Sequence, residues 1–307
     1  MEHLKQYLTK KYALIGAAVL GVVIIVVFVV YIMKKEKCGS EDFYNLKDEY
    51  AKNDKELGSF FKKNPAEIIV LYNNARIELG KKIGFVQSDT DFKTENSATT
   101  SKQLVADATS VSEQFKNMMD EAASGFGEVY YGENECCMLK SVESLDIKIS
   151  KYMREFNLTK EEAVAIIPDA IRGTIIVQTP EGLGDAARSF AQSVRARGET
   201  IKIDNTFASE RIGGYLAIHA ILKIETKDGR FLRCEVQFHL IPIHDARMKS
   251  LNKLSHKLYE IIKTVEVTAR KLKAMRQLLF TVNTYILIKN LTQQVQHNAM
   301  RNYGGVA

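Results

Sequence analysis

The feature that most constrains this chain is an uncharged, strongly apolar run near its N-terminus. It extends over 12–33 and has the sequence YALIGAAVLGVVIIVVFVVYIM. At about 1.5 Å of rise per residue, a helix of this length crosses a hydrocarbon core of about 30 Å. Tyr12 and Tyr31 lie where aromatic residues meet lipid headgroups, and lysines flank both ends. The run therefore predicts one transmembrane helix over 12–33, after a short tail over 1–11.

Two other interpretations of this run agree less well with its residues. A buried helix of a soluble core rarely extends this far without a polar side chain. A cleaved signal peptide has an apolar region of about 7 to 15 residues and then a small-residue cleavage site. Here basic residues follow directly, as Lys34, Lys35 and Lys37. Because the lysines are nearly balanced on the two sides, the positive-inside tendency alone leaves the orientation open.

The composition excludes several classes of protein. With 46% hydrophobic residues, 18 Gly and 4 Pro, the chain is neither wholly disordered nor collagen-like. Its four cysteines include the adjacent pair Cys136 and Cys137, which suits a reducing compartment better than a disulfide scaffold. A net charge of +6 over 307 residues is too small to indicate nucleic-acid binding, so we expect no nucleic-acid partner.

The segment over 34–137 predicts a helical stalk or small helical module without a catalytic pattern. Its apolar residues recur at helical spacing, and Gly80 marks the expected end of the second helix. A stretch rich in Ser, Thr and Asp separates the second and third helices and predicts a loop. The predicted elements are helices over 41–63, 66–79 and 101–123, and a loop over 88–101.

The pattern changes over 138–262, where short β-branched runs alternate with helical segments. A turn at Lys227-Asp228-Gly229 joins two of these runs and predicts a hairpin. This order of elements predicts an α+β domain with one mixed sheet, followed by a helical tail over 263–307. The predicted strands are 175–177, 200–203, 216–225 and 231–238, and the predicted helices are 186–197 and 245–297.

The first cluster of interest is basic and lies where a helix is expected to begin. Ser144 would cap this helix or contact a phosphate, while Lys140, Lys148 and Lys151 supply positive charge beside the helix N-terminus. A solvated basic face fits the same residues, because most lysines are simply exposed. The pattern alone leaves both interpretations open.

Two further clusters place polar residues at strand ends. Asp169 and Arg172 lead into a β-branched run, and a carboxylate at a strand edge is well placed to hold Mg²⁺ on nucleotide phosphates. A turn aspartate after Pro168 is the alternative. After Gly213 and Gly214 come Tyr215, which could stack on a base, and His219. A glycine turn leading to a buried tyrosine and a core histidine is the alternative here.

The fourth cluster lies within a predicted strand. Glu235, Gln237 and His239 alternate along it and therefore face the same side. Buried without partners they would be costly, so a wet functional face explains them better. Asp169 and Glu235 then become two carboxylates of one metal site. His256, on a later helix, could join this face, although a structural histidine fits equally well.

In order and spacing, these clusters resemble the synthetase domain of RelA/SpoT-type nucleotide pyrophosphokinases. The resemblance covers about 138–262 and depends on LKSVESLDIK, PDAIRGTII, GGYLAIH, CEVQFH and SHKLYE. It implies a nucleotidyltransferase-like fold and transfer of pyrophosphate from ATP to the 3′-hydroxyl of GDP or GTP. It also implies roles for nine residues. The ATP phosphates would be met by Lys140, Ser144 and Lys148, and Mg²⁺ would be bound by Asp169. Tyr215 would stack on the acceptor base, and Glu235 would bind metal or activate the hydroxyl. The nucleotide-binding set would be completed by Arg172, His219 and Gln237.

Two departures from the family pattern qualify this resemblance. The family has Arg five residues after the strand-leading Asp, where this chain has Thr174 and carries Arg172 instead. After the Glu-Val-Gln element the family has Ile-Arg-Thr, where this chain has Phe238, His239 and Leu240. These changes resemble divergent domains of toxins and effectors. A catalytically degenerate, membrane-tethered interaction protein is therefore the alternative function. An active domain needs ATP, which places 34–307 in the cytosol.

Overall fold

The computed structural model describes residue 51 and residues 55–92, 95–130, 139–209, 214–248, 273 and 275–289. The chain divides into two compact units, which we describe separately. The first unit contains α2 (Lys55–Phe60), in which Leu57 and Phe60 are buried. The second unit, made of 63–253 and 280–307, contains the sheet and the predicted site residues.

Five strands form one mixed sheet in the order β1-β2-β5-β4-β3. β2 (Ile171–Val177) runs parallel to β5 (Phe231–Leu240), and the other neighbouring pairs are antiparallel. The remaining strands are β1 (Gly127–Tyr130), β3 (Ile201–Asn205) and β4 (Ile218–Glu225). The predicted α+β class and mixed sheet are confirmed.

Short polar residues begin most helices of this unit, because their side-chain oxygens accept hydrogen bonds from the first turn. Asn64 begins α3 in this way, with Pro65 as its first helical residue, and Thr179 with Pro180 does the same for α7. The helices are α3 (Pro65–Ile83), α4 (Ser101–Ala123), α5 (Val142–Phe156), α6 (Lys160–Ala165), α7 (Pro180–Ala196) and α8 (Ile241–Met248).

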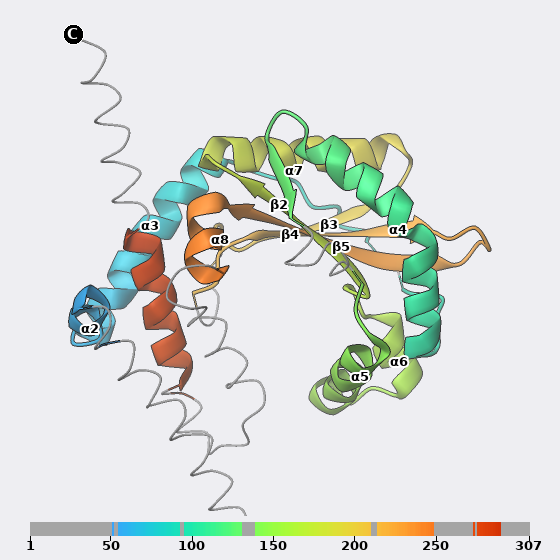
Figure 1. Ribbon diagram of the computed structural model, residues 1–307, viewed down its shortest axis with the longest axis horizontal. Coiled ribbons are helices and arrows are strands. Elements are labelled where there is room, and N and C mark those ends of the chain that lie inside the picture. Colours follow the sequence, from blue (N-terminus) through green and yellow to red (C-terminus); the bar gives the residue numbers. More distant parts are fainter. Residues whose placement is uncertain are drawn as a thin grey trace, which may run out of the picture. The chain divides into compact units, whose positions relative to one another are not determined.

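One face of the sheet packs against α4 and α7. Phe190 of α7 lies against Phe238 of β5, with ring centroids 5.8 Å apart. Gly173 on β2 lets α4 approach closely, since a Cβ there would collide with the side chain of Met119. In the same way, Gly184 lets α7 pack against the end of α3. Figure 1 shows α7 along this side of the sheet, with α8 and α5 on the other side.

The opposite face of the three central strands carries a group of polar side chains. Side chains alternate between faces along a strand, and the buried positions of β4 and β2 are occupied by apolar residues or glycine. Pairing places His219 of β4 opposite Gln237 of β5, and Arg172 of β2 beside Glu235. We call this surface the polar face, made of Arg172, His219, Glu235, Gln237 and His239.

Helix α3 is longer than predicted. It passes through Gly80 and ends at Gly84, whose φ of +74° lies in the left-handed region that favours glycine. Gly80 instead lies where the helix approaches Phe207, since a Cβ at this glycine would lie 3.1 Å from the Phe207 carbonyl oxygen. The expectation that Gly80 stops the helix is therefore wrong, because close packing and not chain reversal requires this glycine.

The structure contains elements that the sequence patterns did not indicate. β1 pairs antiparallel with β2 and forms one edge of the sheet.

Buried residues of α3 and α4, including Tyr72 and Phe115, belong to the same apolar core as the sheet. The helices that the sequence analysis assigned to a stalk over 34–137 thus supply part of the sheet's packing, from Lys63 onward.

The predicted transmembrane helix over 12–33 lies outside the described residues, as does His256. Of the helices that the structure describes, none combines the length and the apolar character that crossing a bilayer requires. The membrane span therefore stays a prediction from sequence.

Candidate active site

Asp169 lies just before β2, between two lysine side chains. The ammonium nitrogen of Lys140 is 2.6 Å from its Oδ2, and that of Lys148 is 2.6 Å from its Oδ1. The aspartate side chain is only 6% exposed, and the lysine side chains are 23% and 22% exposed. A carboxylate buried this deeply is costly unless it is paired, and here two cations compensate its charge.

Backbone structure positions both lysines. The amide of Lys140 donates a hydrogen bond to the Ala170 carbonyl at 3.0 Å, and an isolated bridge pairs Leu139 with Ile171. This short pairing holds Lys140 beside the start of β2. Lys148 lies farther along α5, on the side of the helix that faces Asp169.

Helix α5 begins one turn earlier than the predicted cap. Ser141 is the capping residue, and its hydroxyl accepts a hydrogen bond from the Ser144 amide at 3.2 Å. Ser144 itself is an exposed residue of the first turn. The capping role predicted for Ser144 is therefore wrong, whereas its contact with a phosphate stays a prediction.

The neighbouring charges shift the three pKa values differently. Burial alone would raise the pKa of Asp169, but the charges of Lys148 and Lys140 outweigh it and lower this pKa. Burial also lowers the pKa of Lys140, with help from Lys148 and Arg172, and Asp169 offsets this only in part. The pKa of Lys148 is raised, because Asp169, with contributions from Tyr152 and Glu235, outweighs its burial. Asp169 is therefore a carboxylate at neutral pH.

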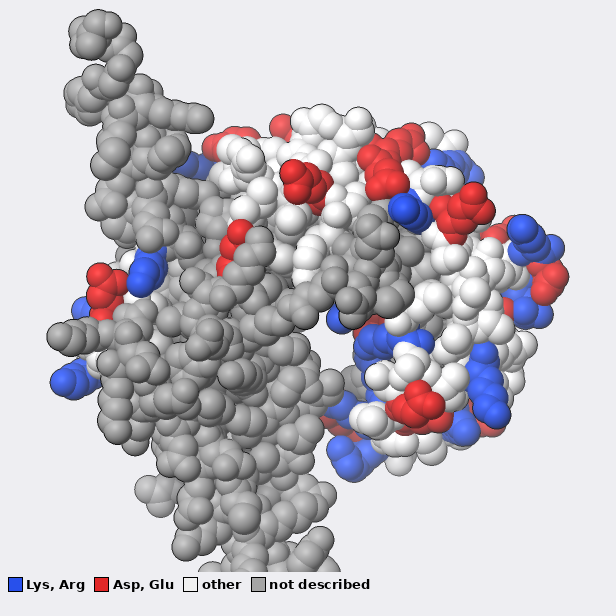
Figure 2. Space-filling view, viewed as in Figure 1, with Lys and Arg blue, Asp and Glu red and all other residues white. Residues whose placement is uncertain are grey.

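The lysines of this region do not form one uniformly solvated face. Lys140 and Lys148 are mostly buried against Asp169, whereas Lys151 is more exposed and lies 3.7 Å from Glu155 on the same helix. Figure 2 shows Lys and Arg side chains on the α5 side of the molecule, with Asp and Glu among them. The solvated-face interpretation thus fits Lys151 and not the two lysines at Asp169.

Glu235 lies near the middle of β5 and contacts two neighbours on the polar face. Nδ1 of His219 is 2.8 Å from its Oε1, and the amide nitrogen of Gln237 donates to its Oε2 at 3.2 Å. Strand pairing brings Arg172 and His219 onto the same surface as Glu235 and Gln237, across β2, β5 and β4.

Electrostatics connects Glu235 to the Asp169 cluster. Burial alone would raise the pKa of Glu235, but the hydrogen bond and charge of His219 lower it, with a contribution from Lys148. The charge of Asp169 acts in the opposite direction. Because its pKa is lowered, Glu235 is ionised at neutral pH, as a base that receives a hydroxyl proton must be.

Tyr215 lies over the polar face between two histidines. Its hydroxyl oxygen is 3.2 Å from Nε2 of His239. Its ring centroid lies 5.5 Å from that of His219 and 5.8 Å from that of His239, with interplanar angles of 66° and 73°. Both imidazoles therefore meet the tyrosine ring edge to face, which fixes its orientation.

Sequence reasoning missed two aromatic neighbours of this site. The ammonium of Lys148 lies 5.3 Å from the ring centre of Tyr152, one helical turn farther along α5. The i,i+4 spacing of these residues was a usable signal. His244, whose ring centroid lies 5.7 Å from that of His239, had no such signal. His244 lies near His239 because α8 follows β5 without an intervening loop.

The chemistry of the two carboxylates fits a magnesium ion. Mg²⁺ prefers oxygen ligands and is usually held by one or two carboxylates together with phosphates and waters. Asp169 and Glu235 supply such oxygens, although the lysines now occupy both oxygens of Asp169. Within the described part of the chain, no three His, Cys, Asp or Glu side chains gather as an all-protein metal site.

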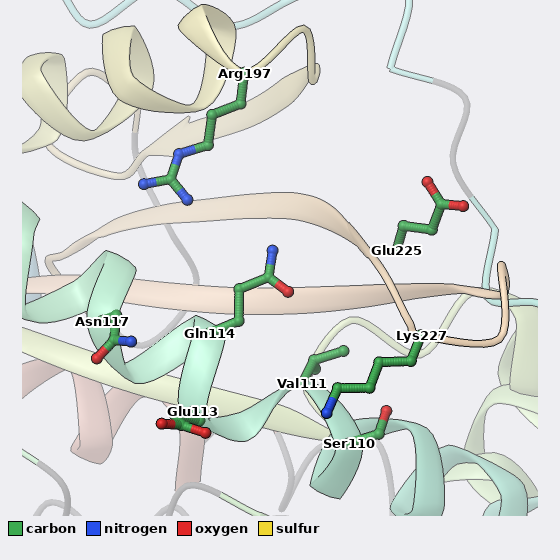
Figure 3. Close-up of a pocket in the computed structure, with 8 residues that line it drawn as sticks. All are labelled: Ser110, Val111, Glu113, Gln114, Asn117, Arg197, Glu225 and Lys227. Carbon is green, nitrogen blue, oxygen red and sulfur yellow. The ribbon is translucent and has the colours of Figure 1, made fainter.

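A separate open groove of about 360 Å³ lies between α4, the end of α7 and the β4–β5 hairpin (Figure 3). Arg197 and Gln114 reach into it from opposite sides. Two acidic and two basic side chains line the groove, so its charges balance and do not favour a polyphosphate. The lining residues are Ser110, Val111, Glu113, Gln114, Asn117, Arg197, Glu225 and Lys227.

No protein-family model matches this chain, and no curated protein sequence matches it significantly. Among solved structures it is similar to the Type VI effector Tas1, solved with its immunity protein, at 18% identity and a TM-score of 0.39, over 61% of this chain and 96% of that one. It is also similar to small alarmone synthetase 1 from Bacillus subtilis bound to its product pppGpp, at 15% identity and a TM-score of 0.40, over 67% of this chain and 95% of the synthetase. A GTP pyrophosphokinase family protein from Streptococcus pneumoniae matches at 13% identity and a TM-score of 0.38, over 66% of this chain and 89% of that one.

Proposed function

We propose that this chain is a nucleotide pyrophosphokinase, which transfers pyrophosphate from ATP to the 3′-hydroxyl of an acceptor nucleotide. The observation that carries the proposal is the buried carboxylate of Asp169, ion-paired to Lys140 and Lys148 at the start of β2, with a second buried carboxylate, Glu235, on the neighbouring strand β5. Polyphosphate chemistry requires this combination, because cations must neutralise the phosphates while a base receives the hydroxyl proton. The sequence resemblance to RelA/SpoT-type synthetases supports the same reaction.

The step needs little covalent participation from the protein. Glu235 accepts the proton of the acceptor 3′-hydroxyl, whose oxygen then bonds to the β-phosphorus of ATP. The bond from this phosphorus to the oxygen bridging to the α-phosphate breaks, and AMP leaves. Lys140 and Lys148 bind the phosphate oxygens and stabilise the charge that develops on them. Arg172, exposed on β2 beside Glu235, adds a third cation on this side of the site.

In this proposal, Asp169 would hold Mg²⁺ together with the ATP phosphates, and Glu235 would supply a second carboxylate. The ion would supply Lewis-acid polarisation of the phosphoryl oxygens. When ATP arrives, the lysines exchange the Asp169 oxygens for phosphate oxygens, which frees the carboxylate as a ligand. His219 and Gln237 keep Glu235 oriented, Tyr215 stacks on the acceptor base, and Ser144 contacts a phosphate from the first turn of α5.

The reaction is tested directly with the purified full-length chain in detergent. Incubated with Mg²⁺, ATP labelled in its β-phosphate and GDP, GTP or ADP, the protein is expected to transfer label to one acceptor and to release AMP. Removing Mg²⁺ with a chelator should abolish transfer. If no acceptor gains label while nucleotide binding persists, the degenerate interaction protein becomes the better description.

We also propose that the protein is anchored in a membrane by residues 12–33, with 34–307 in the cytosol. The supporting observations are the length of the uncharged run and the need of the domain for ATP. After carbonate extraction of membranes, the full-length chain should stay in the pellet, and a variant lacking residues 1–33 should move to the supernatant. Full-length chain in the supernatant would contradict the anchor.

A further inference from the structure

A continuous path of hydrogen bonds joins the side chains of the polar face. His219 bonds to Glu235, Glu235 to Gln237, Gln237 to His239, and His239 to Tyr215, at 2.8, 3.2, 3.3 and 3.2 Å. The ring of Tyr215 then meets the ring of His219, which closes the path. His239 is the member that connects the tyrosine to the carboxylate side.

Chemistry fixes the direction of the bond at His239. A carboxylate only accepts hydrogen bonds, so Gln237 must turn its amide nitrogen toward Glu235. Its carbonyl oxygen consequently faces Nε2 of His239, 3.3 Å away. Because that oxygen also only accepts, Nε2 of His239 must carry the proton. The hydroxyl oxygen of Tyr215, 3.2 Å from the same nitrogen, lies within reach of this N–H as well.

The surroundings of His239 leave it little freedom. His239 is only 4% exposed, and its ring meets the rings of Tyr215 and His244 nearly at right angles. A ring held on several sides keeps its Nε2 pointed at one place. This residue stands where the RelA/SpoT-type pattern has arginine, so the arrangement is a property of this chain.

We propose that His239 is a positioning residue that orients Tyr215 and Gln237 together for the acceptor nucleotide. The inference rests on the proposed function, because it takes Tyr215 as the side chain that stacks on the acceptor base. His239 itself does not touch the reacting atoms. Its Nε2–H holds the tyrosine hydroxyl, and so the plane of the ring, while it fixes the Gln237 amide that orients Glu235.

Three variants separate this role from simple packing. His239→Phe keeps a ring but removes the donor, His239→Gln keeps a nitrogen donor at nearly the same reach, and Phe238→Leu changes a buried neighbour on the opposite face of β5. We expect His239→Phe to weaken binding of the acceptor about tenfold, the loss of one hydrogen bond, with the KM for ATP unchanged. His239→Gln should recover most of this loss, and Phe238→Leu should bind the acceptor within about threefold of the parent.

Calorimetric titration of the full-length chain with ATP and with each of GDP, GTP and ADP distinguishes the two proposals. The parent could bind the acceptor without transferring pyrophosphate, while His239→Phe binds the acceptor tenfold more weakly. In that case the proposed reaction is wrong and the positioning role of His239 stands. If His239→Phe binds as the parent does, or if ATP and acceptor weaken equally, the positioning role is wrong whatever the activity. A parent that binds none of these nucleotides overturns both.

The proton on Nε2 gives a test that needs no nucleotide. The chain contains six histidines, so selective ¹⁵N-histidine labelling yields few signals, and comparison with His239→Phe assigns the one of interest. We expect the nitrogen shifts of His239 to show a protonated Nε2. A neutral ring with its proton on Nδ1 would contradict the hydrogen-bond path and with it the inference.

Discussion

Replacing Glu235 with glutamine is expected to lower the turnover of pyrophosphate transfer by about 10²-fold or more, the scale of removing a general base. Glutamine keeps the size of the side chain but cannot receive the hydroxyl proton. Both oxygens of Glu235 now accept hydrogen bonds, from His219 and Gln237, and an amide can accept only one of them. We therefore also expect a loss of about 1–2 kcal/mol in the free energy of unfolding.

The measurement is the rate of pyrophosphate transfer in a single turnover, with ATP and acceptor both saturating. Urea unfolding of the same variant verifies its fold. Glu225→Gln is the matched control, because this glutamate is exposed at the end of β4. It should leave turnover unchanged. Transfer by Glu235→Gln at the rate of the parent would remove Glu235 from the catalytic role, and a degenerate nucleotide-binding domain would then fit better.

Replacing Asp169 with asparagine is expected to cost about 3 kcal/mol in the free energy of unfolding and to abolish measurable transfer. Breaking a buried ion pair on one side costs about 3–5 kcal/mol, and the partial exposure of Lys140 and Lys148 places this case at the lower end. The two ammonium groups then lack their anion. Pyrophosphate should restore part of the lost stability, because its oxygens can replace the carboxylate.

The control for this variant is Asp185→Asn, at an exposed pair with Arg188, which should change stability by less than about 0.5 kcal/mol. Acid supplies an independent check. Because the pKa of Asp169 is lowered in the folded protein, its stabilising contribution is present above about pH 3.8 and is lost as pH falls through the folded value. The difference between parent and Asp169→Asn should therefore shrink in acid. A constant difference from pH 7 to pH 3 would contradict the ion-pair account.

Alternation along strands made part of this site predictable. Glu235, Gln237 and His239 share one face because strand geometry requires it, and the glycine turn at Gly229 correctly indicated the hairpin between β4 and β5. Such local rules do not indicate partners that are far apart in sequence. Lys140 and Lys148 precede Asp169 by 29 and 21 residues, and only the folded chain shows that both bond to it.

The missed elements have physical reasons as well. β1 is four residues long, begins with glycine and carries no apolar alternation, so pairing with β2 and not propensity makes it a strand. α3 and α4 showed clear helical patterns, but a pattern that predicts a helix does not say what its apolar side packs against. Gly80 looked like a helix end because the close approach of Phe207 leaves no trace in the local sequence.

The strand order has a consequence for how the candidate site is lost on unfolding. β5 is the middle strand, with β2 and β4 on its two sides, whereas β1 and β3 form the edges. Backbone amides at the centre of a sheet exchange with solvent only through large-scale opening, and edges open first. The strands that carry Glu235 and His219, and that begin beside Asp169, are therefore the last to open. Mild heating, or fraying of β1 and β3, would leave β2, β5 and β4 paired. The relative positions of Asp169 and Glu235 should therefore persist almost until global unfolding.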